Sequence, residues 1–394
     1  NSKNKTDVIY FDFAKAFDSV NHDVMLDKLK KQYNINGFLL RFIREYLRGR
    51  KQQVVVDGKL SDISSVASGV PQGSILGPLL FVLFINDIID ELNIDTHALL
   101  YADDMKVFRT IKSPADHVKL QEDINKLAEW AISNKMKFHP SKCKVLESKM
   151  HNQTANSFQY RLSGTILEHT DNERDLGVIV LPNLKWYKHH RIILGKASQK
   201  LGQLRRNCSF SKSQSHRKTL YLAVVRSQFE HCSQIWRPTV STHLKKFENL
   251  QKKGIKWIRN ENFYHYTEQE YLTYQKALKI LPLKQKFELN DLVAFHGLHY
   301  LPKSYLKFPS YVEQAEAVNP NIGTVRITRA MAARDNLQYT CNITPRVDPF
   351  KTSFYFRTCE IWNKLPRLIR EIECKSTFKD KVSEHLWNTL ETGN

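Results

Sequence analysis

The chain has 394 residues, with 60 Lys and Arg against 40 Asp and Glu, a formal net charge of +20 and a pI of about 9.5. This length excludes a peptide or a small disulfide-stapled domain and predicts roughly two or three domains. Hydrophobic residues make up 41% and aromatic residues 11%, which is enough apolar material to bury cores and excludes wholesale disorder.

The first feature in chain order is a short strand followed by an acid. The polar start Asn1–Asp7 has no apolar signal region and no initiator Met, so we expect an intracellular fragment without a secretory signal. Val8–Phe11 is a β-prone apolar run that predicts a buried strand, and Asp12 would project from the end of the sheet. After a turn at Asn21-His22, apolar spacing predicts a helix over residues 24–29.

A glycine-containing loop, Ser68–Ser74, comes next. Gly69 and Gly73 allow close approach of a ligand, and Gln72 can both donate and accept hydrogen bonds. The apolar run Ile75–Ile85 that follows is shorter than the ~18 residues of a membrane span, so we predict a buried helix and no membrane partner. A plain turn before a buried helix explains the loop equally well, and the loop alone does not identify a ligand.

Residues 97–108 read as strand, tight turn and strand, with Asp103 and Asp104 at the tip of the hairpin. Because Asp is common in turns for local hydrogen-bonding reasons, this pair alone has a purely structural explanation. Placed near Asp12 from another strand, however, the acids would repel one another unless a cation neutralised them.

Magnesium suits such a group of acids because it takes hard oxygen ligands and shares one or two carboxylates with substrate phosphates. Two ions about 4 Å apart stabilise the attacking and leaving oxygens of an in-line phosphoryl displacement. Asp12, Asp103 and Asp104 therefore predict a site for two Mg²⁺ ions, with Mn²⁺ as a substitute.

The positive charge is concentrated in one fifth of the chain. Residues 1–181 hold 24 basic and 23 acidic residues, residues 182–260 hold 18 and 2, and residues 261–394 hold 18 and 15. Helical spacing predicts helices around residues 193–204, across Leu220–Ile235 and over Leu244–Leu250.

Basic helices with an apolar face and few acids predict a small bundle that follows a phosphate backbone. A solvated basic surface is the alternative, and an acidic membrane surface is disfavoured because no lipidation motif is present. The predicted nucleic-acid contacts are Lys196, Lys200, Arg205, Arg206, Lys245, Lys246, Lys252 and Lys253.

The last third of the chain has no residue spacing typical of a metal site or of a disulfide framework. Leu301–Asn336 contains three prolines and reads as a long irregular connection. His296 and His299 have the nearest thing to ligand spacing, but a satisfied or solvated pair is expected rather than zinc. Six scattered cysteines without a C-x-x-C pair indicate free thiols in a reducing compartment.

The three acidic and glycine-containing segments together resemble the palm of a reverse transcriptase, in the family's order. Phe11–Asp18 resembles its first catalytic motif, Gly69–Phe81 its second and Tyr101–Asp104 its third. The long second motif is similar to non-LTR (LINE-type) retrotransposons of the jockey and CR1 kind. Asp175–Val180 resembles the family's primer-gripping hairpin, and looser similarity continues through Phe354–Pro366.

The resemblance implies roles for individual residues. Asp12 and Asp103 would hold both metal ions, Asp104 would be the third acid, and the carbonyl of Phe13 would add a ligand. Nucleotide contacts are implied for four residues: Phe17 closing the sugar pocket, Gln72 and Gly73 at the incoming nucleotide, and Lys142 as proton donor or phosphate contact. Without the resemblance, Phe17 is equally a core residue and Lys142 a solvated one.

The resemblance also implies the architecture. We expect an α+β palm over residues 1–181, an antiparallel sheet with helices on one face. A basic helical thumb would follow over 182–260, and a mostly helical region of unknown role over 261–394. Only eleven residues precede Asp12, so the fingers region that the family places before its first motif is expected to be largely missing and to be required for a complete enzyme.

The implied activity is RNA-directed DNA synthesis, with an RNA template, a DNA primer and deoxynucleoside triphosphates as partners. The expected location is the nucleus or a cytoplasmic ribonucleoprotein. The alternative is a non-enzymatic remnant that only binds nucleic acid. The sequence leaves open the oligomeric state and whether this chain alone is active.

Overall fold

The computed structural model describes residues 5–90, 92–148, 158–211, 213–261, 266–300, 308–314, 337–345 and 347–392. The chain divides into two compact units, Ser2–Leu184 and Lys185–Asn394. The first boundary expected from the sequence, at 181/182, lies three residues from this division. The sequence predicts a further boundary at 260/261, but residues on both sides of it belong to one compact unit, Lys185–Asn394.

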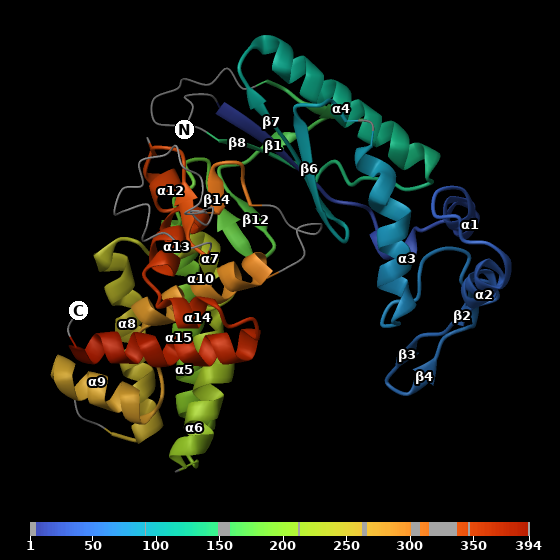
Figure 1. Ribbon diagram of the computed structural model, residues 1–394. Helices are drawn as coiled ribbons and strands as arrows, with labels where there is room; N and C mark the ends of the chain where they lie inside the picture. Colours follow the sequence, from blue (N-terminus) through green and yellow to red (C-terminus); the bar gives the residue numbers. More distant parts are fainter. Residues whose placement is uncertain are drawn as a thin grey trace. The chain divides into compact units, whose positions relative to one another are not determined.

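A five-stranded sheet forms the centre of the first unit (Figure 1). Its strand order is β11-β8-β1-β7-β6. The strands are β1 (Lys5–Phe11), β6 (Thr96–Tyr101), β7 (Asp104–Ile111), β8 (Lys144–Ser148) and β11 (Glu168–His169). Four strands pair antiparallel, as predicted, but the short edge strand β11 pairs parallel to β8.

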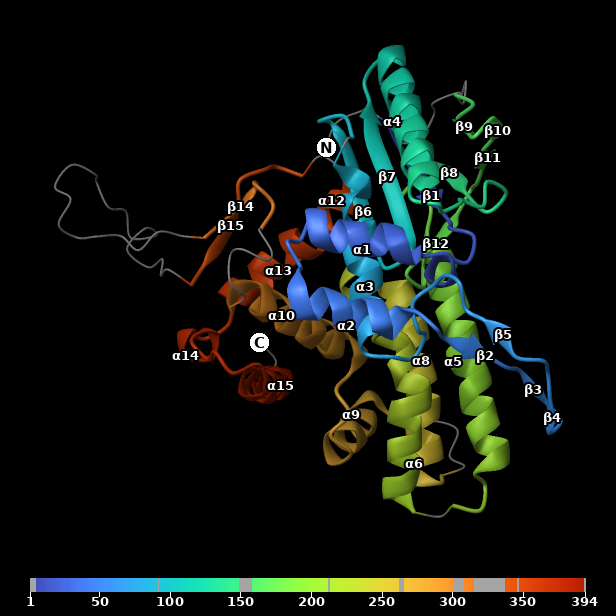
Figure 2. The ribbon, with the colours of Figure 1, turned by 90° about the vertical axis from the view of Figure 1, so that its right-hand side faces the viewer.

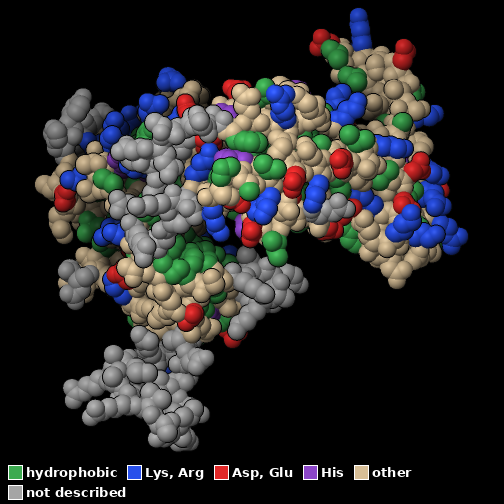
Figure 3. All heavy atoms as spheres, turned by 90° about the horizontal axis from the view of Figure 1, so that it is seen from above, with side chains coloured by type: hydrophobic (Ala, Val, Ile, Leu, Met, Phe, Trp, Pro, Cys, Tyr) green, Lys and Arg blue, Asp and Glu red, His purple; other side chains and the backbone are tan. Residues whose placement is uncertain are grey.

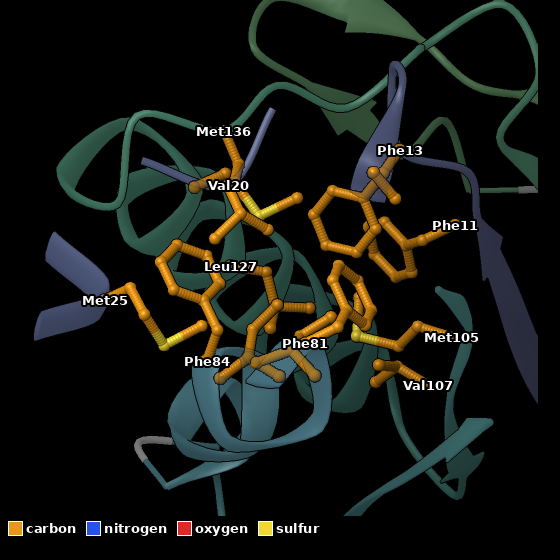
Figure 4. Packing of buried hydrophobic residues seen from close by; sticks show 14 of the residues in the cluster. Phe11, Phe13, Val20, Met25, Phe81, Phe84, Met105, Val107, Leu127 and Met136 are labelled. Carbon is orange, nitrogen blue, oxygen red and sulfur yellow. The ribbon is translucent and has the colours of Figure 1, made fainter. Parts of the chain in front are cut away.

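Helices cover one face of this sheet, which confirms the predicted arrangement. Alternate residues point into the core, so Ile9 and Phe11 of β1 and Met105 and Val107 of β7 are buried. Their partners come from α1 (His22–Lys31), α3 (Leu76–Ile85) and α4 (Pro114–Ser133), as Figure 4 shows for Met25, Phe81, Phe84 and Leu127.

Local signals set where these helices begin. The side chain of Asn21 accepts a hydrogen bond from the backbone N–H of Val24 (3.1 Å) and caps α1. Ser113 and Asp116 form a capping box at the start of α4, where Pro114 occupies the first turn. The predicted strands, the hairpin and both apolar helices are thus confirmed.

Shorter elements complete the first unit. The helical ones are η1 (Ala16–Asp18), α2 (Gly37–Leu47) and η2 (Asn86–Ile89). Two-stranded pairs are formed by β2 (Lys51–Gln52) with β5 (Ser64–Ser65), β3 (Val55–Val56) with β4 (Lys59–Leu60), β9 (Arg161–Leu162) with β10 (Thr165–Ile166), and β12 (Glu173–Asp175) with β13 (Val178–Val180).

The second unit is mostly helical (Figure 2). It contains α5 (Tyr187–Asn207), α6 (Gln214–Leu220), η3 (Tyr221–Val225), η4 (Arg226–Phe229), α7 (Ser233–Trp236), α8 (Ser241–Arg259), α9 (Glu268–Ala277), α10 (Leu283–Tyr300), α12 (Asp348–Lys351), α13 (Phe354–Asn363), α14 (Arg367–Arg370) and α15 (Lys375–Thr392). A small antiparallel pair joins β14 (Val312–Gln314) and β15 (Tyr339–Cys341).

The single helix predicted across Leu220–Ile235 is wrong in detail, because the segment breaks into α6, η3, η4 and α7. Tyr221 is fully buried against Gly254 of α8, where a side chain on residue 254 would meet the Tyr221 ring at 2.2 Å. Cys232 has φ 51°, a left-handed conformation that a continuous helix does not contain. Tertiary packing therefore overrides the apolar pattern.

Buried ion pairs explain why residues 185–394 form one unit. The carboxylate of Asp291 on α10 has no exposed surface and accepts hydrogen bonds from Arg237 (2.8 Å) and Arg357 (2.9 Å). Gln251 on α8 donates to the carbonyl of Leu281 (3.1 Å). These bonds join segments on both sides of residue 260, so separating them would leave buried charges unpaired.

The expectation of a satisfied His pair holds only in part. His296 interacts through Nε2 with the carbonyl of Ile372 (2.7 Å), whereas its Nδ1 is buried without a hydrogen-bond partner among the described residues. The half-buried His299 pairs with the hydroxyl of Tyr339. All six cysteines are free thiols. Most of the expected connection Leu301–Asn336 lies outside the described residues. Within the described ranges, no helix has the length and apolar composition to cross a bilayer.

Candidate active site

Strand pairing brings Asp12 to the tip of the acidic hairpin. Phe11 pairs with Met105 across β1 and β7, so Asp12 lies at the end of the strand that neighbours Asp104. Tyr101 pairs with Asp104 across the hairpin, and Ala102 takes a left-handed conformation with φ 54°. This two-residue turn places Asp103 at the tip and Asp104 at the start of β7.

The backbone around Asp12 is fixed by the segment after α4. The carbonyl of Asp12 accepts a hydrogen bond from the N–H of His139 (2.8 Å), and the N–H of Ala14 donates to the carbonyl of Lys137 (2.8 Å). Between them, the buried ring of Phe13 stacks on Phe138 at a centroid distance of 4.3 Å. The carboxylate of Asp12 therefore projects from a rigid strand end.

A cavity of about 350 Å³ opens at this point and contains two of the three predicted acids. Asp12, Asp104 and Lys142 line it, whereas Asp103 is absent from the residues found along its wall. The other lining residues are Tyr10, Phe11, Leu99, Leu100, Tyr101, Met105, Lys106, Glu173, Arg174, Asp175 and Leu176.

The electrostatics of the cavity reflect crowded carboxylates. The pKa of Asp104 is raised, first by desolvation and then by the negative charges of Asp103, Asp175 and Asp12. Lys142 Nζ lies 3.7 Å from Asp12 Oδ1 and supplies a positive charge on the other side. Such a set of acids favours binding of a cation.

The donor set fits a divalent ion that completes its coordination with substrate oxygens. Among the described residues, no three Asp, Glu, His or Cys side chains are grouped to hold a metal by themselves. Three carboxylates are expected to meet at one site. Two of them, Asp12 and Asp104, line the same cavity, and Asp103 precedes Asp104 in the sequence without lining the cavity. Magnesium commonly uses one or two carboxylates together with substrate phosphates.

A second cavity, of about 740 Å³, lies beside the glycine-containing loop. Gln72 lines it, and its amide donates a hydrogen bond to the carboxylate of Asp18 (2.8 Å). Arg50 also lines this cavity and donates to the carbonyl of Gly69 (3.2 Å). Gln72 and Lys142, both predicted nucleotide contacts, therefore lie in different cavities of the same unit.

The remaining predicted nucleotide contacts lie outside the walls of both cavities. Phe17 stacks on Phe81 of α3 at a centroid distance of 4.3 Å, which is the core role left open for it. Gly73 has φ +78° and Gly69 has φ +88°. At Gly69, a Cβ would lie 2.7 Å from the Cα of Asp18, so this glycine is needed for the loop to pack on the first motif.

Sequence reasoning missed several residues of the first cavity. Lys106, Glu173 and Asp175 line it, and Lys106 forms an ion pair with Asp175. One signal was present: Lys106 is two residues after Asp104 on the same strand, so both side chains lie on the same face. The approach of Asp175 depends on tertiary structure that the local sequence does not reveal.

The predicted nucleic-acid contacts of the second unit are mostly exposed. Lys196, Lys200, Arg205, Arg206, Lys245, Lys246 and Lys253 are exposed, whereas Lys252 is half-buried with its ammonium 4.9 Å from the ring centre of Tyr271.

Other basic residues of the segment 182–260 have structural roles. Arg217 is buried and donates to the carbonyl of Trp257 (2.8 Å), and Arg226 is buried and donates to that of Leu281 (3.1 Å). The segment has an excess of 16 positive charges, but fewer basic side chains than this number suggests are available at its surface to bind phosphates. Figure 3 shows one face of the whole molecule, on which both basic and acidic side chains lie at the surface.

Comparison with known proteins finds a family model that matches part of the chain and several similar proteins. Residues 1–178 match the family described as reverse transcriptase (RNA-dependent DNA polymerase). The chain is similar to the RNA-directed DNA polymerase of the mobile element jockey from Drosophila funebris, at 26% identity over 65% of this chain and 28% of that protein. The counterpart in Drosophila melanogaster is 27% identical over 71% of this chain and 31% of that protein.

These relatives are much longer, and the matched part of the chain spans less than a third of their length. Among solved structures, an apo telomerase from Candida tropicalis aligns with 70% of this chain and 50% of its own, at 11% identity and a TM-score of 0.32.

Proposed function

We propose a polymerase function for this chain, which carries a reverse transcriptase domain related to those of non-LTR (LINE-type) retrotransposons. The proposed reaction is extension of a DNA primer 3′ end on an RNA template. The observation that carries the proposal is the shared cavity of Asp12 and Asp104, at the adjacent ends of β1 and β7, inside the matched domain.

Reverse transcriptases use divalent metal ions, and we propose Mg²⁺ here. Asp12, Asp103, Asp104 and the carbonyl of Phe13 would hold two ions, which when bound activate the primer hydroxyl and neutralise charge on the phosphates. Asp12 contributes a carboxylate on a fixed strand end, so little reorganisation is needed for binding.

The chain's own residues would orient the nucleotide. Lys142, whose Nζ lies 3.7 Å from Asp12 Oδ1, would contact a phosphate or give a proton to the leaving group. Asp18 holds the amide of Gln72 through a 2.8 Å hydrogen bond, which would orient Gln72 toward the incoming nucleotide. Phe17, packed on Phe81, would close the sugar pocket, as the family resemblance implies.

The exposed basic residues of α5 and α8 would bind the template and primer through their phosphates. Such binding releases counterions and weakens steeply with salt. We propose that the protein acts inside the cell, in the nucleus or in a cytoplasmic particle with its RNA. We further propose that the family's upstream fingers region is needed for full activity.

Primer extension tests the polymerase proposal. The chain, alone and joined to the sequence that precedes it in its element, is incubated with an RNA template, a DNA primer, deoxynucleoside triphosphates and Mg²⁺. We expect extension by the longer protein, and its loss in Asp12→Ala and Asp103→Asn. Extension that survives both substitutions would reject the assignment of these acids, and no extension by either protein would reject the polymerase itself.

A second candidate function is nucleic-acid binding without catalysis. It is favoured by the exposed Lys and Arg residues of α5 and α8, which need no metal to bind phosphates. This candidate predicts salt-dependent binding that is unchanged by Asp12→Ala, together with no extension by the longer protein. Binding that does not weaken between ~50 and 200 mM salt would contradict both candidates, since both require phosphate contacts.

A further inference from the structure

An ion pair joins two separate sheets at the wall of the catalytic cavity. Lys106 lies on β7 of the five-stranded sheet, and Asp175 lies on β12 of the two-stranded hairpin β12–β13. Their side chains form an ion pair with exposed fractions of 26% and 19%. A charge pair that is mostly shielded from water is stronger than an exposed one, because water and salt screen it less.

The alternation of β7 directs Lys106 to the same face as the catalytic acid. Met105 and Val107 point into the core, so Asp104 and Lys106 lie on the opposite face. In the register of the sheet, Lys106 is paired with Tyr10 of β1 and Leu99 of β6, and both residues line the cavity. Lys106 therefore stands in the middle of the cavity floor.

The hairpin β12–β13 supplies the wall above this floor. Its tight turn contains Leu176 (φ 44°) and Gly177 (φ 89°), the pattern of a two-residue hairpin with positive φ at both positions. Leu176, at the tip, lines the cavity together with Asp12 and Asp104 and is 43% exposed. The position of this tip thus helps to define the space next to the acids.

Asp175 would be unfavourable in this cavity without its partner. The cavity also contains Asp12, Asp104 and Glu173, and the charge of Asp175 is one of those that raise the pKa of Asp104. Like charges in one desolvated site repel, so an unpaired Asp175 would push the hairpin away or compete for a cation. Pairing with Lys106 offsets part of this repulsion and holds the Asp175 carboxylate in place.

We propose that Lys106 and Asp175 are positioning residues, whose ion pair holds the hairpin β12–β13 against the catalytic strands and so sets where the primer 3′ end lies relative to Asp12 and Asp104. The effect on the primer 3′ end rests on the proposed polymerase function. The pairing itself is a property of the fold and is measurable without activity.

Hydrogen–deuterium exchange of this chain tests the pairing. Lys106→Met and Asp175→Asn are each expected to speed exchange of peptides covering residues 173–180 about tenfold, and the double variant to add little to either. Lys106→Arg should retain protection. Peptides from β1 and α4 are internal references for the fold.

Lys144→Met is the matched control. Like Lys106, Lys144 is a lysine of the main sheet that forms an ion pair, in its case with Glu168 on β11. Neither Lys144 nor Glu168 lines the cavity. This variant should leave peptides 173–180 unchanged. Unchanged exchange in Lys106→Met, or additive effects in the double variant, would overturn the proposal.

Primer extension by the longer protein then tests the functional part. Lys106→Met should raise the KM for primer–template about tenfold, with a smaller change in kcat, and Lys106→Arg should restore it. An altered exchange pattern with unchanged KM would overturn the positioning role. A wild-type protein that extends no primer would reject the polymerase function, whereas exchange would still decide the pairing.

Discussion

The two compact units use charge in opposite ways. Residues 1–181 are nearly neutral, and their proposed function depends on a few carboxylates, two of which strand register places at one cavity. In the second unit, Lys185–Asn394, the excess of positive charge lies mostly before residue 261 and is distributed along helices. Single substitutions should therefore be decisive in the first unit and incremental in the second.

Within each unit, burial decides which charges are available. Asp12 and Asp104 remain open to the cavity, whereas Arg217 and Arg226 are buried and serve the fold. A count of charges identifies the basic unit, but only contacts separate the residues that can reach a phosphate from those that hold helices together.

The largest expected effect is the loss of a catalytic carboxylate. Asp12→Ala should lower primer extension by the longer protein at least about 1,000-fold, because a lost metal ligand removes several kcal/mol of transition-state stabilisation. Binding of primer–template, measured by fluorescence anisotropy, should be unchanged.

The matched control for this prediction is Asp23→Ala, whose carboxylate pairs with Arg48 and is 76% exposed. This variant should extend primers normally. Equal loss in both variants would show that Asp12 acts through stability rather than through the site.

Next in size is the effect of a Cβ in the glycine-containing loop. Gly69→Ala should lower the free energy of unfolding of the first unit by about 3 kcal/mol. The substitution strains the backbone, which has φ +88° at this position, and its Cβ would lie only 2.7 Å from the Cα of Asp18. Urea unfolding followed by circular dichroism measures this change in free energy.

Gly164→Ala provides the comparison, since its φ is +82° but no atom lies within 4 Å of the added Cβ. It should cost only about 1 kcal/mol. Equal costs at the two positions would mean that packing of the loop on Asp18 contributes nothing.

His189 should make the stability of the second unit fall in acid. Burial, with the nearby charges of His190, His231 and Lys196, lowers the pKa of His189 from 6.5 to about 4. The imidazole is therefore neutral in the fold, and its contribution, fully present above pH 6.5, is lost as pH falls toward 4.

At pH 5 the loss of stability should be about 2 kcal/mol. Chemical denaturation at pH 7 and pH 5 would measure it, and His189→Leu, next to Trp236 in the core, should flatten the difference. A pH dependence identical in the variant would assign the effect to other groups.

The smallest effect is expected from surface lysines. Lys196→Gln with Lys200→Gln should weaken nucleic-acid binding about tenfold near 0.15 M salt and reduce the salt slope by about 2. Lys364→Gln with Lys381→Gln, which removes lysines paired with Glu360 and Glu384, should change neither. Equal effects of both pairs would mean that only net charge matters.

The sequence predicted features that depend on neighbouring residues. Strand β1 with Asp12 at its end and the hairpin with Asp103 and Asp104 at its tip follow from local apolar patterns and turn preferences, and the structure has them. The sequence also led to the expectation that Asp12 and the hairpin acids lie close together, and the observed pairing of β1 with β7 agrees with it.

Features that depend on distant contacts were not predictable in this way. The ion pair of Lys106 with Asp175 joins residues 69 positions apart, and no local pattern marks it. The interruption of the helix at Tyr221 requires knowing that Gly254 lies opposite. The buried state of Arg217 is equally hidden, because composition counts a buried arginine as if it were exposed.

Metal-directed cleavage would show whether Asp12 and the acidic hairpin share divalent ions. Fe²⁺ replaces Mg²⁺ in the presence of ascorbate and peroxide, and radicals formed at the bound ion cut the nearby backbone. We predict cuts close to Asp12 and to residues 102–104, both lost in Asp12→Ala. Cuts confined to other segments, or a pattern that Asp12→Ala leaves unchanged, would contradict the account.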